Sequence, residues 1–337
     1  MKTALYASAA VIALAAFGTA PAFAQSRDTI QIAGSSTVLP FSSIVAEEFG
    51  ATFPEFKTPV VGSGGTGGGF RQFCEGVGDN TIDIANASRP IRDSEREACV
   101  ANGVSDIREI QFGFDGIVFA SSAAGGDFAL TPVQLYKAIA AKVPVDGEFV
   151  DNPYTTWEQI DASLPNQPIA LAIPASNHGT REVFQEKVIT PGFKAAELPE
   201  GLTDDEKVAL ETTFRQDVVV EIAGDYTETL ARLTADPNTV GVFGLSFYDQ
   251  NRDTLKVATI DGVVPSLETV AAGEYPVSRP LYFYVKGEHI GVIPGLAEFT
   301  EYFLADSVSG NGGILEAAGL IPQPADVTAE VLAAFQQ

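Results

Sequence analysis

Residues 62–74 read GSGGTGGGFRQFC, in which six of the first eight positions are glycine and an aromatic residue, an arginine and a cysteine follow. A short β-branched run, residues 58–61, ends just before the glycines, and Phe70 and Phe73 have the spacing of one helix face. Bare backbone between a strand and a helix leaves N–H groups uncovered at the positive end of the helix dipole. The stretch therefore predicts a strand–turn–helix unit with a turn open to a ligand.

Three interpretations of this glycine turn are open. Gly62, Gly64 and Gly67 match the dinucleotide fingerprint, and Asp83 follows about 20 residues later, as that motif requires. The same composition suits a cradle for a small anion, which needs only exposed N–H groups. A flexible loop without a ligand is the third interpretation. We expect no cofactor, because exported proteins rarely use nicotinamide and the chain begins with an export signal.

That signal is MKTALYASAAVIALAAFGTAPAFA, in which Lys2 precedes an apolar run and Ala-Phe-Ala stands at residues 22–24. This pattern predicts a secretory signal peptide, residues 1–24, that is removed after Ala24. A membrane anchor is the alternative, but the apolar run is shorter than the ~20 residues that span a bilayer. We expect a soluble protein of the periplasm.

The two cysteines, Cys74 and Cys99, fit this oxidising compartment and predict a disulfide. Such a bridge stabilises a fold by roughly 3 kcal/mol in the chain-entropy model. Two separate buried thiols are the alternative. A metal site is not expected, because two cysteines and two distant histidines make no cluster of ligands.

The charge of the chain narrows the choice of partner. The formal net charge is −24 and no basic run occurs, which excludes nucleic acid as a partner. An acidic surface repels anions at long range, although salt screens this beyond ~10 Å. If the ligand is an anion, local donors must hold it.

Short apolar runs bounded by turn residues alternate with helical patterns, which predicts an α/β fold with helices covering a mostly parallel sheet. The length of 337 residues suggests two domains. Residues 191–214 are expected to form a peripheral segment, which begins with polar residues and continues with a helical pattern. The expected strands are residues 29–33, 58–61, 82–85, 107–110, 116–120, 169–173, 218–222, 240–243, 255–260 and 281–285.

Four strand–helix turns carry donors, and ligands of such sheets bind beyond the carboxyl ends of the strands. In the first, residues 32–41, Ser36 or Thr37 is the expected N-cap and Pro40 fits the first helical turn. The second is the glycine turn, with hydroxyls at Ser63 and Thr66. The third and fourth turns offer Ser88 and Arg89, then Ser176, Asn177, His178, Gly179, Thr180 and Arg181. Together they suit a cleft between two lobes that closes on one small oxyanion.

At the level of whole motifs the chain resembles the periplasmic phosphate-binding proteins of high-affinity phosphate ABC transporters. The resemblance runs in order over nearly all of the mature chain and is closest to the branch with two cysteines and an SRPI turn. It is carried by GSSTVLPF, VGSGGTGGGFRQFC, IANASRPI, FDGIVFA, HGTREVF, GVFGLSFY and YPVSRPLYFYV.

The resemblance implies a two-lobed periplasmic-binding-protein fold of type II, with the ligand cleft between lobes joined by crossing hinge strands. Lobe one would hold residues 25–113 and 279–337, and lobe two residues 114–278. The implied partners are inorganic phosphate and the membrane permease of an ABC transporter, for a monomer that is not an enzyme. The implied ligand-binding residues are Ser36, Thr37, the Val38 N–H, Ser63, Ser88, Arg89, His178, Gly179, Thr180 and Arg181.

Several departures from the family pattern leave the identity of the ligand open. Many members have Asp at the position of Ser88, where it accepts the ligand proton and so rejects sulfate, and many have Arg at the position of Pro174. Arg89 and Arg181 are candidates to replace that cation, and Asp115 is a candidate proton acceptor. His178, where many members have Ser, predicts tighter anion binding when it is protonated.

Two rival functions remain. The first is a binding protein for another oxyanion, such as sulfate or molybdate. The second is an exported hydrolase, which the absence of a G-x-S-x-G elbow and the presence of only two histidines disfavour.

Overall fold

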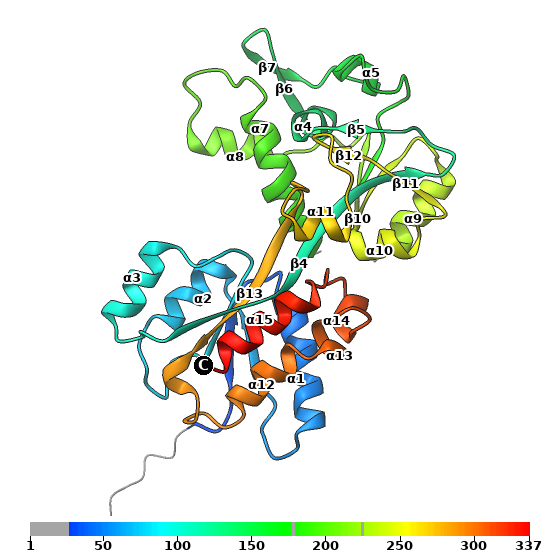
Figure 1. Ribbon diagram of the computed structural model, residues 1–337. Coiled ribbons are helices and arrows are strands. Elements are labelled where there is room, and N and C mark those ends of the chain that lie inside the picture. The colour runs from blue at the N-terminus through cyan, green and yellow to red at the C-terminus, as the bar shows by residue number, and fades with distance from the viewer. Residues whose placement is uncertain (1–26, 177–178, 224–225) are drawn as a thin grey trace, which may run out of the picture.

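Two long antiparallel strands, β4 (Ile107–Ser122) and β13 (Ser278–Lys286), run from one lobe of the molecule to the other (Figure 1). They belong to a computed structural model that describes residues 27–176, 179–223 and 226–337. β13 pairs with β3 (Ile84–Ala87) in one lobe, and β4 pairs with β10 (Val240–Gly244) and β11 (Leu255–Val257) in the other. Together with β1 (Gln31–Gly34), β2 (Val60–Ser63), β8 (Leu171–Pro174) and β9 (Val219–Ile222), they form one sheet in the order β2-β1-β3-β13-β4-β10-β8-β9.

The single strand β4 corrects the prediction of two strands at residues 107–110 and 116–120. The ladder to β13 continues through the glycines between them: Leu281 pairs with Gly113 and Tyr282 with Gln111, so Phe112 is the extra residue of a bulge. A Cβ on Gly113 would lie 2.7 Å from the Ile321 carbonyl oxygen. The glycine thus marks a close backbone approach rather than the end of a strand.

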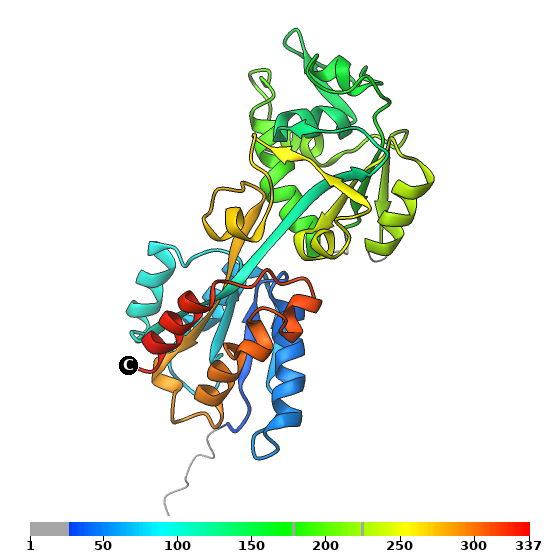
Figure 2. The same ribbon diagram turned by 45° about the vertical axis from the view of Figure 1, so that its right-hand side comes forward.

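Lobe one contains the parallel strands β1 (Gln31–Gly34), β2 (Val60–Ser63) and β3 (Ile84–Ala87). Helices from both ends of the chain cover this sheet, and Figure 2 shows the C-terminal helices beside α1. Phe49, Phe112 and Phe303 lie in its core. The helices are α1 (Leu39–Thr52), α2 (Gly65–Phe73), α3 (Asp93–Ala101), the 3-10 helix η2 (Gly287–His289), α12 (Leu296–Phe303), α13 (Asp306–Ser309), α14 (Ile314–Ala317) and α15 (Ala325–Phe335).

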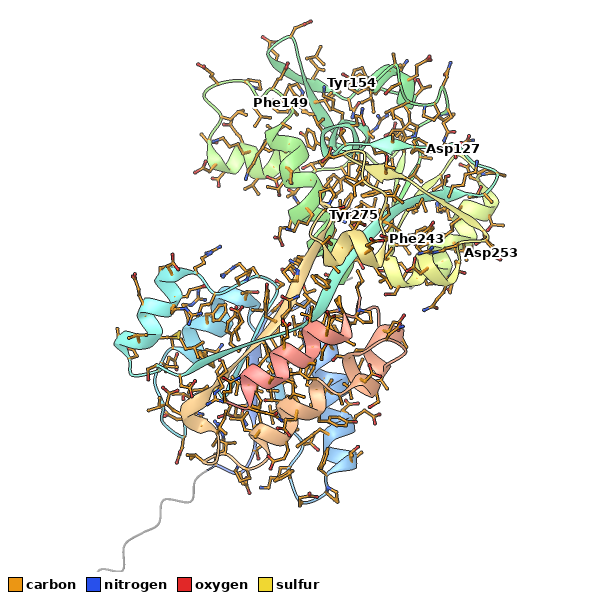
Figure 3. The ribbon with its side chains drawn as sticks, in the orientation of Figure 1. Asp127, Phe149, Tyr154, Phe243, Asp253 and Tyr275 are labelled. Atoms are coloured by element: carbon orange, nitrogen blue, oxygen red, sulfur yellow. A yellow bond between two sulfur atoms is a disulfide. The ribbon has the colours of Figure 1, made fainter. Side chains whose placement is uncertain are left out.

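Lobe two contains the parallel strands β8 (Leu171–Pro174), β9 (Val219–Ile222) and β10 (Val240–Gly244), with β11 (Leu255–Val257) on β4. Phe243 and Tyr275 lie in its core, near the ends of the crossing strands (Figure 3). Two small sheets pair β5 (Ala129–Leu130) with β12 (Thr259–Ile260) and β6 (Lys142–Val145) with β7 (Glu148–Asp151). The helices are α4 (Pro132–Ile139), α5 (Trp157–Ile160), α6 (Gly179–Phe184), the π-helix η1 (Gln185–Ile189), α7 (Thr190–Lys194), α8 (Asp204–Thr212), α9 (Tyr226–Ala235), α10 (Leu245–Gln250) and α11 (Leu267–Ala271).

This architecture confirms the α/β class and most of the predicted strands. The predicted helix face of Phe70 and Phe73 is confirmed, because both side chains are buried on α2, which ends at Phe73. The exact lobe boundaries stay a prediction. Across the residues that the structure describes, no helix has the length and hydropathy of a membrane span.

The predicted disulfide between Cys74 and Cys99 is confirmed. Cys74 directly follows α2, and Cys99 lies in α3 with its side chain fully buried. The bridge therefore fixes the glycine-rich helix to its neighbour on the surface of lobe one.

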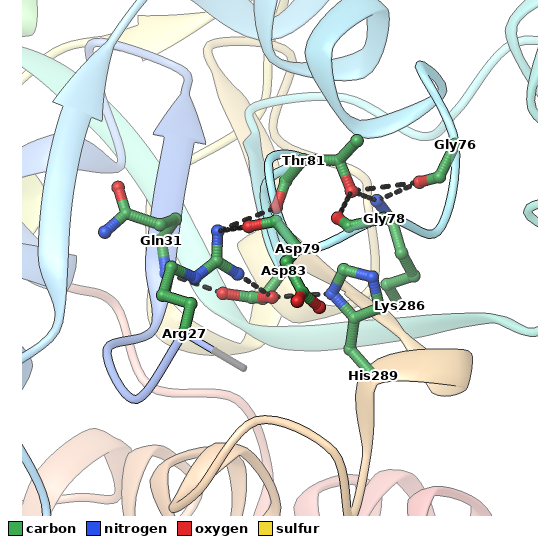
Figure 4. Close-up of polar contacts among 9 residues, drawn as sticks. All are labelled: Arg27, Gln31, Gly76, Gly78, Asp79, Thr81, Asp83, Lys286 and His289. Atoms are coloured by element: carbon green, nitrogen blue, oxygen red, sulfur yellow. Dashed lines mark hydrogen bonds and ion pairs between the residues drawn. The ribbon is translucent and has the colours of Figure 1, made fainter. Parts of the chain in front are cut away.

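Lobe one also holds a buried ionic cluster at the edge where β1 and β3 begin (Figure 4). Asp83, which is fully buried, accepts hydrogen bonds from Arg27 at 2.5 Å and from the Gln31 N–H at 2.7 Å, and it lies 2.6 Å from His289 Nδ1. Lys286, equally buried at the end of β13, donates to the Gly76 carbonyl at 2.6 Å. The cluster ties the start of the described chain to the end of a crossing strand.

Burial lowers the pKa of Lys286 from 10.5 to about 8, although the charges of Asp83 and Glu288 oppose the shift. Between these two values the unfolded chain holds more protons than the folded protein, so this lysine makes the free energy of unfolding rise with pH. Chemical denaturation from pH 7.5 to 10 should show this rise in the wild type and lose it in Lys286→Met. The exposed Lys194→Met is the control, and equal slopes in all three proteins would contradict the assignment.

Candidate functional site

Three strand ends lie side by side at one edge of the lobe-one sheet, and a glycine lets helix α2 pack closely against them. Gly34, the last residue of β1, pairs with Ser63 of β2 and with Asn86 of β3. Helix α2 lies directly on this edge, since a Cβ on Gly69 would stand 2.6 Å from the Gly34 Cα. Three of the four predicted turns therefore start from one edge of the lobe-one sheet.

The first turn presents its hydroxyls to the opposite lobe. The prediction that Ser36 or Thr37 caps α1 is wrong: the N-cap is Val38, and no side chain caps the helix. Instead, Ser36 Oγ and Thr37 Oγ1 both donate to Glu182 Oε2 in α6, at 3.1 and 2.5 Å. Their donors thus face the interlobe cleft.

Arg279, on crossing strand β13, is the buried cation of this cleft, with only 2% of its side chain exposed. Its Nη2 donates to Thr37 Oγ1 at 2.6 Å and its Nη1 to Glu186 Oε2 at 2.5 Å. The Thr37 hydroxyl accepts a hydrogen bond from Arg279 and donates one to Glu182. The guanidinium therefore polarises this hydroxyl and makes it a stronger donor at the surface of the cleft.

Asp115, on crossing strand β4, faces the same guanidinium. Its Oδ2 lies 3.6 Å from Arg279 Nε, and both atoms are buried without a hydrogen-bond partner in the described structure. Burial raises the pKa of Asp115 to about 6; Arg279 opposes this shift, whereas Glu182 and Glu186 add to it. The carboxyl group is therefore close to its titration range at neutral pH.

A cavity of about 370 Å³ opens beside these groups and draws its walls from both lobes. Thr37 and Asp115 line it from one side and Thr180 from the other, where the Thr180 hydroxyl is hydrogen-bonded to Tyr226. The remaining lining residues are Pro40, Phe41, Tyr226, Gly244, Ser246, Phe247, Gln250, Glu316, Ala317, Ala318 and Gly319. The cavity therefore lies between the lobes.

The second and third turns lie near this cavity but do not line it. The Ser88 N–H donates to Thr66 Oγ1 at 3.2 Å, which joins the two turns, and Ser63 is exposed. Arg89 is held by Glu95 through two hydrogen bonds of 2.8 Å. In this arrangement the Arg89 guanidinium binds a carboxylate of its own lobe.

In the fourth turn, α6 begins at Gly179, which leaves Thr180 in its first turn. Arg181 points into lobe two, where it donates to the Pro174 carbonyl at 2.8 Å and stacks over the Phe214 ring at 4.9 Å. His178 lies outside the described residues, so its role stays a prediction.

Sequence reasoning missed two central groups, Arg279 and Glu182. Arg279 stands in YPVSRPLYFYV, one of the motifs that carry the resemblance, and its charge beside a run of apolar residues was the available signal. Glu182 lies within HGTREVF, but a glutamate in a helix is too common to indicate a role in a site. The described residues contain no cluster of side chains that could hold a metal ion.

Comparison with known proteins places this geometry in a family. Residues 19–307 match the PBP superfamily domain. The chain is 30% identical to protein SphX of Synechococcus elongatus, over 96% of this chain and 88% of that one. It is 29% identical to the phosphate-binding protein PstS of Staphylococcus epidermidis, over 86% and 78% of the two chains.

Solved structures of phosphate-binding proteins have a similar fold. A possible phosphate-binding protein from Planctomyces limnophilus superposes with a TM-score of 0.68 at 27% identity, covering 92% of this chain and 99% of that one. PstS from Borrelia burgdorferi has a TM-score of 0.60 at 19% identity and covers 88% and 100%, which supports the fold alone.

The raised pKa of Asp115 predicts how stability depends on pH. Between 3.8, its ordinary value, and about 6 the folded protein holds more protons than the unfolded chain. Asp115 therefore makes the free energy of unfolding fall as pH rises through this window. Denaturant titrations from pH 4 to 7 should show a smaller fall in Asp115→Asn than in the wild type. The exposed Asp253→Asn is the control; an unchanged slope in Asp115→Asn would refute the assignment.

Proposed function

The chain belongs to the PBP superfamily, and from that premise we propose that it binds inorganic phosphate between its lobes and delivers it to the permease of an ABC transporter. Its similarity to phosphate-binding protein PstS and to a possible phosphate-binding protein of known structure supports this ligand. The proposal includes export to the periplasm, a monomeric state and the absence of catalysis.

One observation carries the proposal at the level of residues: Thr37 and Thr180 line the same cavity from opposite lobes, and Arg279 stands directly behind Thr37. Hydroxyl donors backed by a guanidinium match the oxygens of a tetrahedral anion. The charge of Arg279 is buried, so it acts on a bound anion with little screening by salt.

Binding then closes the cleft without any covalent step. An anion that contacts Ser36, Thr37 and the Val38 N–H on lobe one and Gly179 and Thr180 on lobe two favours the closed form, because only that form offers both sets of donors. The turns at Ser63, Ser88 and Arg89 start from the same sheet edge as Thr37, and we propose that they complete the site on closure. The closed, loaded protein is the form that docks on the permease.

In this proposal Asp115 is the residue that selects phosphate over sulfate. Ser88 cannot serve as the acidic proton acceptor, whereas Asp115 lines the cavity and its Oδ2 has no donor. A protonated phosphate oxygen can accept from Arg279 Nε and donate to Asp115 Oδ2, which satisfies both unpaired atoms. Sulfate carries no proton at neutral pH and leaves the carboxylate unpaired, at a cost of several kcal/mol.

A panel of oxyanions tests the ligand and its selectivity together. Calorimetry at pH 7.5 should give binding of phosphate and arsenate, which carry a proton, and weak or no binding of sulfate and molybdate. In Asp115→Asn the preference for phosphate over sulfate should fall by about tenfold or more, because the acceptor for the ligand proton is weakened. Tighter binding of sulfate or molybdate than of phosphate by the wild type would favour the rival oxyanion function.

The three arginines near the cleft can be ranked by substitution. Arg279→Met should weaken phosphate binding by more than about 100-fold, because a buried charge is removed from the anion. Arg89→Met and Arg181→Met should have smaller effects, since each guanidinium has partners within its own lobe. Arg279→Lys and circular dichroism separate a binding defect from misfolding. A larger loss in Arg89→Met than in Arg279→Met would move the cation of the site to Arg89.

A further inference from the structure

We propose that Glu182 is a resident counter-ligand: in the empty protein its carboxylate occupies donors of the binding site, and it must leave when the anion enters. The inference rests on the proposed function for the identity of the anion. It makes Glu182 a residue that sets affinity, although it is not among the ligand-binding residues that the sequence predicted.

The contacts of one oxygen atom carry this inference. Glu182 Oε2 accepts from Ser36 Oγ at 3.1 Å and from Thr37 Oγ1 at 2.5 Å, and it lies 3.6 Å from Arg279 Nη2. Two hydroxyl donors and a guanidinium around one anionic oxygen are the set that an oxyanion ligand requires. The carboxylate therefore takes the place of a ligand oxygen.

The charges around Arg279 explain why Glu182 and an anion exclude each other. Asp115, Glu182 and Glu186 lie 3.6, 3.6 and 2.5 Å from the guanidinium, so three carboxyl groups already surround one cation. A further anion beside all three would meet strong like-charge repulsion in a buried site. At least one carboxylate has to move away on binding.

Exposure indicates that Glu182 is the group that moves. Its side chain is 46% exposed, whereas Asp115 is only 17% exposed and is fixed on a crossing strand. Glu186, 48% exposed, has its contact with Arg279 on the Nη1 side, away from the Nη2 that serves Thr37. Rotation of Glu182 into water frees both hydroxyls without moving the backbone.

The contact also joins the lobes, because Glu182 lies in α6 of lobe two and both hydroxyls lie in the first turn of lobe one. Without an anion, this carboxylate is therefore a bridge between the lobes. Anion binding then exchanges one interlobe bridge for another, and breaking the Glu182 bridge reduces the net affinity for the anion.

Phosphate calorimetry on substituted proteins tests the exchange. Glu182→Ala should bind phosphate about tenfold more tightly than the wild type, because the donors are free and a like charge is gone. Glu182→Gln, which keeps the shape but not the charge, should lie between the two. Glu158→Gln, an exposed position in α5 with the same change in net charge, should bind like the wild type. Equal or weaker binding by Glu182→Ala would overturn the proposal.

Small-angle scattering of the ligand-free proteins tests the bridge without any ligand. Glu182→Ala should have a larger radius of gyration than the wild type and Glu158→Gln, because its lobes are no longer joined by this carboxylate. An unchanged radius would overturn the bridge. Failure of the proposed function and failure of this inference can be told apart. If the wild type does not bind phosphate, the proposed function is contradicted. The scattering comparison still decides whether Glu182 joins the lobes.

Discussion

One buried guanidinium, that of Arg279, organises the space between the lobes. It lies on a strand that both lobes share, and its partners come from three places: Thr37 in lobe one, Glu186 in lobe two and Asp115 on the other crossing strand. A charge this deeply buried is stable only when such partners surround it. Because the partners come from both lobes, satisfying the charge and closing the cleft are coupled.

The rest of the fold keeps those partners in position. The crossing strands β4 and β13 pair with each other and with strands of both lobes, so Asp115 and Arg279 belong to one continuous sheet. In lobe one, close packing at Gly69, the disulfide and the buried cluster around Asp83 restrain the sheet from which the first three turns start. The sheet edge that carries these turns is therefore held by contacts within lobe one.

The sequence predicted what local patterns encode. Short β-branched runs located most strands, and the paired cysteines predicted the disulfide, because both signals lie in neighbouring residues or in simple composition. The break between residues 110 and 116 was wrong, since glycines that suit a turn also suit a bulge against Ile321. The contacts of Arg279 and Glu182 could not be predicted, because they join residues more than 90 positions apart in the chain.

We expect the anion to bind where Thr37, Arg279 and Thr180 meet. A crystal structure of the protein with arsenate tests it most directly, because the anomalous signal of arsenic locates the ion independently of the protein. One peak should lie within hydrogen-bonding reach of the Thr37 and Thr180 hydroxyls, in front of Arg279. A fully occupied peak elsewhere, with these three residues still in contact only with protein groups, would contradict it.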